Sequence, residues 1–525
     1  MLTFNFNLKN ILNILKFASL FGAFFLFPKI YWSQRDILQL LPGAQKLVYN
    51  EKTGEQKLIG GVNFTYQGNT MYCDSASFYE KRQEVRAFGK VHINKNDTLN
   101  LFCDSLYYSG KRKYAKLWGH VRVRDREYKI TTDSMDYDAK KTQGIFRNGG
   151  KIESILTNEV LTSKVGYFHP NTKNFFFKGK VKYKSPQVTM TTDTLRYQYL
   201  SKKVYFHGPT KIKTKDADLS CERGWYHTQT EEGEISQNAE IYTNSKHILG
   251  DNLYYHPKKE IYIGKGNVVY QDTLQPYSFK GNYFYKNDIT RKTFVTGKAL
   301  CSYKLKADTL FLHADTLMSL QDSLGEAKQI FGYRNAKFFK NNIQGKCDSL
   351  VFHKELDYLE FFNEPIVWSQ NTELKGEFMK AKIQDSTIQY IEITNKTSAI
   401  MEIDSGNYYN QIAGKKMFAY FKDNQLIRTD VKGNAQTIYF PEERKQNDTI
   451  IEIKRSGMNR IYASDLKIVL DSGEVRAITY IDKPDAVFYP LDKINKEEQF
   501  VKNFSWNPLL RPKQGEDFLL DKVKD

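Results

Sequence analysis

Apolar and polar residues alternate along much of this chain. Between Ala115 and Val123 every second residue is apolar or glycine, and most residues between them are polar or charged. The same alternation recurs at 85–93 and 175–183. A period of two places successive side chains on opposite faces of an extended strand, whereas a helix would show apolar residues three and four apart. The pattern therefore predicts an all-β chain whose strands each have one apolar face.

Two short signatures recur along this alternation. Asp-Ser/Thr-Leu/Met-x-Tyr stands at Asp104–Tyr108, Asp133–Tyr137 and Asp193–Tyr197, and between residues 74 and 281 its copies fall 28–30 residues apart. A Gly-x-Val signature lies midway between these copies, as at Gly89 and Gly119. Each repeat therefore holds two strands. One such repeat cannot bury its own apolar face, so the repeats are expected to stack as a β-solenoid or jellyroll.

The alternation slips by one residue at each Asp. Leu101 and Cys103 are apolar at odd positions, but after Asp104 the apolar residues are Leu106 and Tyr108. A bulge or corner absorbs one residue in this way. Asp and Ser suit such a corner because their side chains bond nearby backbone N–H groups. We therefore predict a bend at the Asp of every repeat.

The repeats are less regular after about residue 310, where Asp308 and Asp315 are only seven residues apart. They return in altered form as far as about residue 490. We therefore divide the chain into a regular array at 35–310, less regular repeats at 311–490 and a C-terminal tail at 491–525. The tail has no repeat, contains Pro508 and Pro512, and is expected to be loosely ordered.

The N-terminus has the pattern of a secretory signal peptide. Lys9 and Lys16 precede an uncharged apolar run of 11 residues at 17–27. A membrane helix needs about 20 such residues, while a signal core needs roughly 7–15. We predict that residues 1–34 are a signal peptide cleaved near Ser33 and Gln34. An uncleaved N-terminal anchor is the alternative.

The charge and the cysteines narrow the function. A formal net charge of +18 favours anionic partners such as nucleic acid, phospholipid headgroups or lipopolysaccharide phosphates. Export argues against nucleic acid. Five cysteines are too few for a disulfide-built fold of this size, and their odd number leaves at least one free. Cys73 and Cys103 are in equivalent positions one repeat apart, so a disulfide or two buried free thiols are both open.

No catalytic motif is present. Aligned Asp residues could suggest the acid pair of a polysaccharide-cleaving enzyme. A catalytic pair, however, needs two distinct environments, and here the same corner recurs throughout. The nine histidines show no metal-ligand spacing. We therefore predict a protein that is not an enzyme and that has no catalytic residue, cofactor or metal.

The paired Asp-x-Leu-x-Tyr and Gly-x-Val signatures resemble the OstA-like family of periplasmic lipopolysaccharide-transport proteins. The resemblance is strongest at 40–300 and weaker to about residue 490. It implies a jellyroll, an open V-shaped stack of antiparallel strands whose apolar inner face holds acyl chains. It also implies end-to-end stacking with other lipopolysaccharide-transport proteins or with a second copy. This chain departs from the family's small bridging members by its greater length.

Inward positions of the regular array are the candidate lipid-binding residues. Their aromatic members suit core packing as well as lipid contact. The glycines suit either a backbone bend or a wider interior. The candidates are Phe78, Leu106, Tyr108, Leu117, Gly119, Tyr137, Phe177, Gly179, Val181 and Tyr197.

These observations predict a scaffold that binds and transports lipopolysaccharide or a related glycolipid and contributes to outer-membrane assembly. It is expected in the periplasm, with an association with the outer membrane. A structural or adhesive surface β-solenoid is the alternative, and a polysaccharide-active enzyme is the least favoured reading.

Overall fold

The computed structural model describes the chain from residue 39 to residue 513. Short gaps lie at 67–68, 96–98, 125, 127, 139, 142, 170–173, 199, 306–307, 324–325, 385–386, 424 and 448–449. The predicted signal peptide at 1–34 lies outside the described residues.

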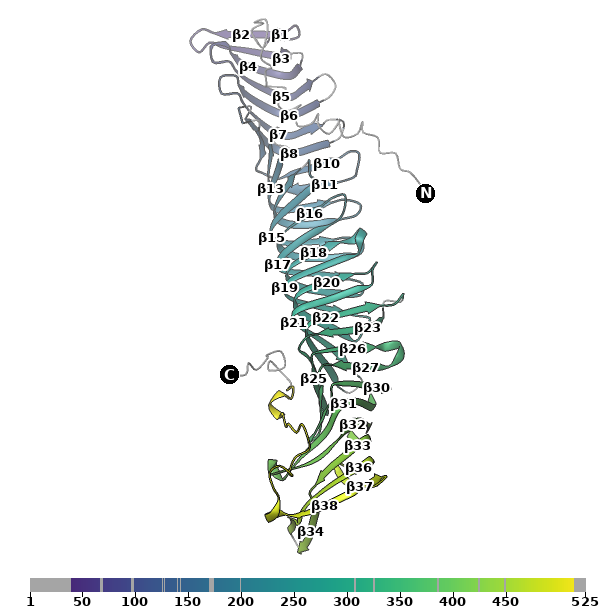
Figure 1. The fold of residues 1–525 in the computed structure, drawn as a ribbon. Coiled ribbons are helices and arrows are strands. Elements are labelled where there is room, and N and C mark those ends of the chain that lie inside the picture. The colour runs from purple at the N-terminus through teal and green to yellow at the C-terminus, as the bar shows by residue number, and fades with distance from the viewer. Residues whose placement is uncertain are drawn as a thin grey trace, which may run out of the picture. The chain divides into compact units, whose positions relative to one another are not determined.

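The described residues form strands and six short 3-10 turns, and none of them forms an α-helix (Figure 1). This confirms the prediction of an all-β chain. The turns are η1 (Glu80–Arg82), η2 (Pro257–Lys259), η3 (Lys354–Leu356), η4 (Asp404–Gly406), η5 (Leu491–Lys493) and η6 (Pro508–Leu510).

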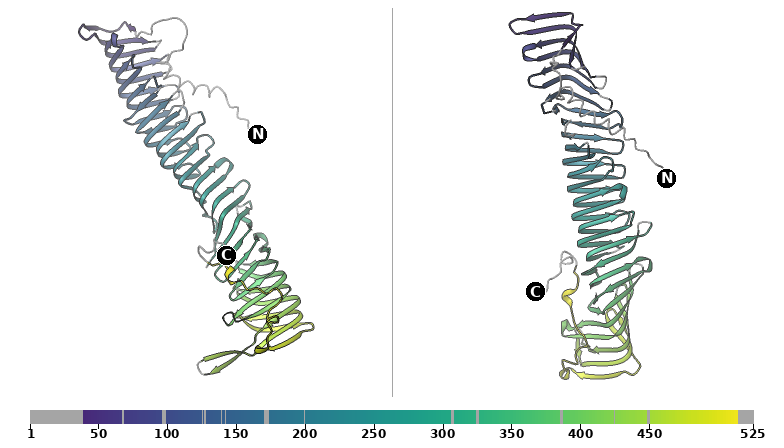
Figure 2. Two further views of the ribbon diagram at one scale, coloured as in Figure 1. Left: turned by 60° about the vertical axis from the view of Figure 1, so that its left-hand side comes forward. Right: turned by 45° about the horizontal axis from the view of Figure 1, so that its top comes forward.

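The chain divides into two compact units. Unit 1 comprises residues up to 244 together with 252–258, and unit 2 comprises 245–251 together with the residues from 259 onward. Strand β18 (Lys246–His256) contributes to both. Figure 2 shows the strand order within each unit from two further sides. The sequence-based boundary at residue 310 stays a prediction.

Unit 1 contains β1 to β17. Their bounds are β1 (Gln39–Leu41), β2 (Lys46–Asn50), β3 (Glu55–Tyr66), β4 (Asn69–Tyr79), β5 (Glu84–Lys95), β6 (Leu99–Ser109), β7 (Tyr114–Arg124), β8 (Tyr128–Asp138), β9 (Gln143–Phe146), β10 (Gly150–Ser154), β11 (Val160–Ser163), β12 (Val165–His169), β13 (Asn174–Lys184), β14 (Thr189–Gln198), β15 (Lys203–Lys213), β16 (Ala217–His227) and β17 (Gly233–Thr243). From β3 to β8 and from β13 to β17 each strand pairs antiparallel with the next along the chain.

The long strands of unit 1 are divided by corners at the predicted places. Between β5 and β6, Phe88 pairs with Ser105 and Val91 pairs with Cys103, so two residues of β5 face Asp104 alone. Those two residues, Gly89 and Lys90, have φ values of 73° and 45°. The extra residue therefore lies on the Gly-x strand, whereas the sequence had suggested the Asp-Ser step.

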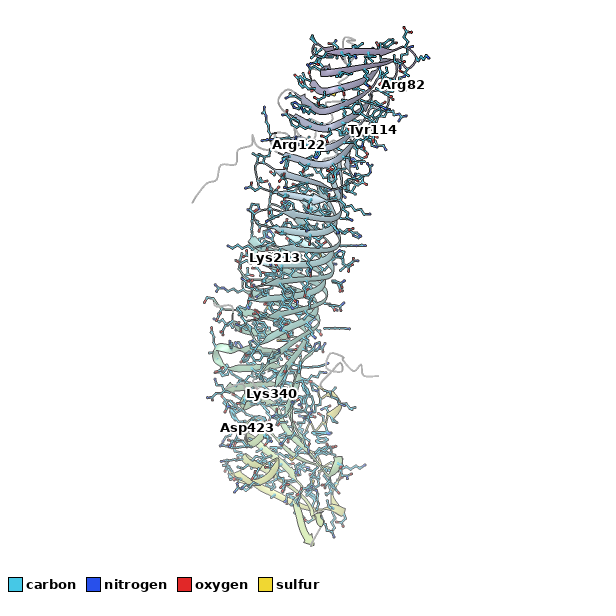
Figure 3. The ribbon with its side chains drawn as sticks, turned by 180° about the vertical axis from the view of Figure 1, so that it is seen from behind. Arg82, Tyr114, Arg122, Lys213, Lys340 and Asp423 are labelled. Atoms are coloured by element: carbon cyan, nitrogen blue, oxygen red, sulfur yellow. The ribbon has the colours of Figure 1, made fainter. Side chains whose placement is uncertain are left out.

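The corners divide the strands of each unit into two walls. We call the strand halves that precede a Gly-x corner, such as 84–88, the first wall. The halves that follow it, such as 91–95, form the second wall. Each Asp strand is divided in the same way, since 105–109 pairs with 84–88 and 99–103 pairs with 91–95. The inner faces meet, since the rings of Phe64 in the second wall and Phe78 in the first lie 6.5 Å apart. Figure 3 shows Arg82 and Tyr114 on one side of unit 1 and Arg122 and Lys213 on the other.

Buried apolar residues stack from strand to strand along each wall. In the first wall of unit 1 the directly paired residues are Leu58, Ala76, Ala87, Leu106, Leu117 and Met135. All six are buried. Each repeat thus covers the apolar face of its neighbour, which is how stacked repeats gain stability.

Unit 2 contains β19 to β38. Their bounds are β19 (Ile261–Asp272), β20 (Tyr277–Asn287), β21 (Lys292–Lys304), β22 (Thr309–Gln321), β23 (Ala327–Tyr333), β24 (Ala336–Lys340), β25 (Ile343–Cys347), β26 (Ser349–His353), β27 (Tyr358–Phe362), β28 (Ile366–Ser369), β29 (Thr372–Lys375), β30 (Phe378–Gln384), β31 (Thr387–Ile403), β32 (Tyr408–Lys422), β33 (Gln425–Tyr439), β34 (Glu442–Asn447), β35 (Ile450–Arg455), β36 (Gly457–Asp471), β37 (Glu474–Ile481) and β38 (Asp485–Pro490).

The less regular repeats after about residue 310 have the same arrangement of strands and corners. Strand β22 pairs with both β23 and β24, which are two halves of one strand interrupted at its corner. The corner residues Arg334 and Asn335 have positive φ values, as do Asn363 and Glu364 at a later corner. The corners therefore continue here without glycine, which is why the sequence signature fades.

The C-terminal tail packs on unit 2 as far as the structure describes it (Figure 1). Val501 is 3% exposed and packs in a cluster with Ile438, Phe440 and Met458. Farther on, the backbone N–H of Asn507 donates to Glu373, and Arg511 donates to Gln344. The expectation of a loosely ordered tail is therefore wrong for residues 491–513. Residues 514–525 lie outside the described part.

Candidate functional site

The sequence-predicted lipid-contact residues all belong to unit 1. Leu106, Leu117, Tyr137, Phe177 and Val181 are buried. Phe78, Tyr108 and Tyr197 are half-buried. Leu106 and Leu117 are directly paired, and Tyr108 and Tyr137 flank Ala115 from either side. Apart from Val181 and the two corner glycines, the candidates share the first wall, so the structure brings them together on one inner face.

Gly119 and Gly179 are explained by the corner itself. Gly119 has a φ of 72°, and a β-carbon there would overlap the Asp104 carboxylate. Gly179 has a φ of 78° and would meet Lys164 instead. The Asp104 carboxylate is bound by His120, 2.7 Å away, and Asp251 accepts a hydrogen bond from Asn267 at a later corner. The space beside these glycines is therefore occupied by corner side chains, which supports a backbone bend, and not a wider interior, as the reason for glycine at these corners.

We expect Gly119→Ala to lower the free energy of unfolding by about 2 kcal/mol, because the left-handed backbone and the overlap with Asp104 both cost energy. Gly54→Ala is the matched control, since Gly54 also has a left-handed φ but a β-carbon there would meet nothing within 4 Å. Urea unfolding of both variants isolates the overlap. Equal losses would show that Asp104 does not hold this position to glycine.

Cys73 and Cys103 do not form a disulfide. Cys73 lies on β4 and Cys103 on β6, and β5 pairs with both strands, so two strand spacings separate the cysteines. Two spacings amount to about 9.6 Å, beyond the roughly 7 Å limit for a bridged pair. All five cysteines are buried free thiols. The disulfide alternative is therefore wrong, and burial raises the pKa of the Cys103 thiol to about 12.

Unit 2 contains a cavity of about 310 Å³ between its two walls. This volume is at the lower end of the range for small-molecule sites, roughly 300–1,000 Å³. From the second wall it is lined by Tyr277, Cys301, Tyr303, Leu310, Leu312, Phe338 and Ile343. From the first wall it is lined by Ala327, Ile330, Leu350, Phe352, Leu359, Ile383 and Ile388.

The cavity is apolar along its strands and charged at their ends. Lys340 is the last residue of β24, Lys354 begins η3, and Asp357 follows that turn. Figure 3 labels Lys340. Lys354 pairs with Glu326 at 2.6 Å, and Asp357 lies 3.8 Å from Lys382. In the apolar part, burial raises the pKa of the Cys301 thiol to about 12. The arrangement suits an amphiphile whose chain lies in the cavity and whose anionic group meets the lysines.

A second space of only about 40 Å³ lies among Ala399, Ile412, Ile438 and Leu470. Among the described residues, no group of three or more His, Cys, Asp and Glu could hold a metal ion. The part of the chain that the structure describes also has no helix long and apolar enough to cross a membrane.

Sequence reasoning missed this cavity. The sequence does contain a pattern that could have indicated it. Apolar residues two positions apart occur at Leu310 and Leu312, and again at Leu350 and Phe352. These residues lie where the Asp and Gly signatures weaken, so they were not counted among the candidates.

Comparison with known proteins gives one family match. A family model described as OstA-like protein matches residues 41–193. No curated protein matches. Among solved structures, LptH is described as the LptA-homologous periplasmic component of the lipopolysaccharide transport device of Pseudomonas aeruginosa. It is 14% identical with a TM-score of 0.18, and the match covers 21% of this chain and 75% of LptH.

A structure from Bacteroides ovatus that is described as a dipeptidyl aminopeptidase IV is 10% identical, with a TM-score of 0.09. That match covers 77% of this chain and 55% of the other. Both TM-scores are too low to bear on fold or function. The family match confirms the resemblance read from the repeats, and residues 41–193 of this chain belong to the OstA-like family.

Proposed function

We propose that this protein is a periplasmic scaffold that binds lipopolysaccharide or a related glycolipid and contributes to its transport in outer-membrane assembly. The observation that carries the proposal is the apolar cavity between the walls of unit 2, with Lys340 and Lys354 at its end. Burial of acyl chains against such a surface is favourable in proportion to the apolar area removed from water. Lysines at the opening bind phosphate as point charges.

The OstA-like segment supports the same function for unit 1. We propose that the two walls form an open V-shaped jellyroll section and that the first-wall candidates, such as Leu117 and Tyr137, belong to its lipid-facing surface. The protein then acts by holding its ligand and catalyses no reaction. Export would place it in the periplasm, in agreement with the signal peptide predicted at 1–34.

The strands at the sequence ends of the two units support end-to-end stacking with other lipopolysaccharide-transport proteins or with a second copy. Among the described residues, β2 pairs only with β3, and β38 pairs only with β36. These strands also expose large apolar side chains, including Leu47 and Tyr49 on β2 and Val487 and Phe488 on β38. An unpaired strand edge is a template for pairing with another chain.

Charge reversal at the cavity tests the proposed function. We expect Lys340→Glu to weaken lipopolysaccharide binding roughly tenfold, because a carboxylate then faces the phosphates. Lys346→Glu is the matched control. It makes the same charge change on neighbouring β25, at a half-buried residue that does not line the cavity. Binding is measured by titration of the purified protein with lipopolysaccharide. The proposal is wrong if the wild-type protein binds no lipopolysaccharide.

A further inference from the structure

A chain of buried polar side chains lies inside unit 2, next to the cavity. At its centre is Lys286 on β20, whose side chain is only 2% exposed. Lys286 has the same strand parity as buried Phe284, so both belong to the inner face of the first wall. Its ammonium lies 2.9 Å from the carboxylate of Asp288. A buried lysine is unusual unless it is paired.

This chain of side chains connects the two walls twice. Lys246, at the start of β18, lies 2.5 Å from the other oxygen of Asp288. The preceding residue, Ser245, accepts the backbone hydrogen bond of Thr273, which follows the second-wall half of β19. Lys246 therefore lies beside the second wall, whereas Asp288 follows the first-wall half of β20.

The second connection runs through Gln321 at the end of β22. Its amide oxygen accepts a hydrogen bond from Lys286 at 2.9 Å, and its amide nitrogen donates to the Tyr277 hydroxyl at 3.2 Å. Gln321 belongs to the first wall and Tyr277 to the second. We call the set Lys246, Asp288, Lys286, Gln321 and Tyr277 the clasp.

The clasp adjoins the cavity. Tyr277 belongs to the clasp and also lines the cavity. Along the first wall, Lys286 pairs with Thr293, Thr293 with Ser319, and Ser319 with the cavity-lining Ile330. Along the first wall two strands, β21 and β22, therefore lie between Lys286 and Ile330, and the clasp lies on the side of the cavity that leads toward β19.

Two hydroxyls between the clasp and the cavity point to a closed state that can open. Thr293 and Ser319 are 3% and 4% exposed, and neither hydroxyl has a hydrogen-bond partner. An unsatisfied buried hydroxyl is unfavourable, so a permanently closed core would be expected to avoid two of them side by side. Water or a polar group of a ligand would satisfy both when the walls separate.

The chemistry of the clasp also favours opening over permanent closure. Well-packed apolar residues hold two walls together at least as well as a buried ion pair, because the ion pair must first be desolvated. Directly beside the clasp such packing exists, since the rings of Tyr270 and Phe284 from opposite walls lie 4.9 Å apart. Charged partners, unlike apolar ones, can exchange each other for water.

We infer that the clasp is a gate, which must open for an amphiphilic ligand to pass between the cavity and the interior beside β19 and β18. The inference rests on the proposed function, since it assumes that the cavity holds a ligand. It adds that the cavity is a separate binding site and not one stretch of an open channel. The ligand leaves this site when the two polar contacts of the clasp break.

The test removes both cross-wall contacts and keeps the buried charge paired. The double variant Lys246→Met with Tyr277→Phe deletes the second-wall partner of each contact, while Lys286 and Asp288 remain together on the first wall. Lys396→Met is the control, because it breaks an exposed ion pair, with Glu377 at 2.8 Å. The probe is cis-parinaric acid, a fatty acid that fluoresces in apolar sites, and its dissociation is followed by stopped-flow fluorescence.

We expect dissociation about tenfold faster in the double variant, an intermediate rate in Tyr277→Phe alone, and the wild-type rate in Lys396→Met. Circular dichroism checks that each variant is folded. A folded double variant with the wild-type rate overturns the gate while leaving the proposed function standing. If the double variant does not fold, Tyr277→Phe alone decides in the same way. A wild-type protein that binds neither the probe nor lipopolysaccharide overturns both.

Discussion

Leu117→Asp is expected to lower the free energy of unfolding of unit 1 by roughly 3–5 kcal/mol. Leu117 is 2% exposed and pairs with Leu106 on one side and Met135 on the other. The substitution removes a buried apolar side chain and leaves a carboxylate without a partner. Burial should raise the pKa of this carboxylate above its unfolded value. The variant should therefore regain part of its stability as the pH falls below the folded pKa.

Arg124→Asp is the control for this prediction, because Arg124 lies at the exposed end of the same strand. Urea unfolding at neutral pH and again at about pH 4, near the ordinary pKa of an aspartate, measures both effects. A loss in Leu117→Asp no larger than that in the control would show that the first wall of unit 1 is open to water. The inner face of the jellyroll would then need another account.

Ala327→Phe is expected to weaken lipopolysaccharide binding at least tenfold while leaving the stability of unit 2 nearly unchanged. Ala327 is the first residue of β23, is half-buried and lines the cavity. An added phenyl ring can enter the empty space without displacing packed atoms, so the overpacking cost of a filled core does not arise. The same ring occupies volume that the acyl chain needs, and binding falls for that reason alone.

Lys328→Phe provides the matched comparison, because it adds the same ring one residue further along β23 at an exposed position. Titration with lipopolysaccharide is read beside the thermal midpoint for both variants. Wild-type binding in a folded Ala327→Phe protein would place the ligand outside this cavity. A large drop in its thermal midpoint would show that the space is not available to a side chain.

Much of the fold could be predicted because strand periodicity is a local property. The alternation around Leu117 required an extended chain with one apolar face, and the slip at Asp104 required a corner, whatever lay beside them. The same local view could not choose between two explanations of Gly119. Its left-handed φ and the Asp104 carboxylate that fills the space beside it belong to the corner between two strands.

The sequence alone could not predict which residues of different strands lie next to each other. Cys73 and Cys103 are equivalent in the repeat, but each repeat contributes two strands, and strand β5 lies between the two that carry them. In the same way, nothing local to Val501 shows that it packs against Ile438 and Met458. Because the tail has no repeat, the sequence predicted that it is loosely ordered. Its contacts are made with strands that are far away along the chain.

By itself the sequence determined the all-β class, the two-strand repeat, the position of the corners and the OstA-like character of residues 41–193, because each depends on residues a few positions apart. Only the tertiary structure decided where the inner faces leave a cavity and where they are joined. The cavity needs Tyr277, Leu312 and Ile388 in one place, and the clasp needs Lys246 beside Asp288. Such meetings depend on how many strands are stacked between two residues and on which wall each one joins, and side-chain periodicity carries no information about either.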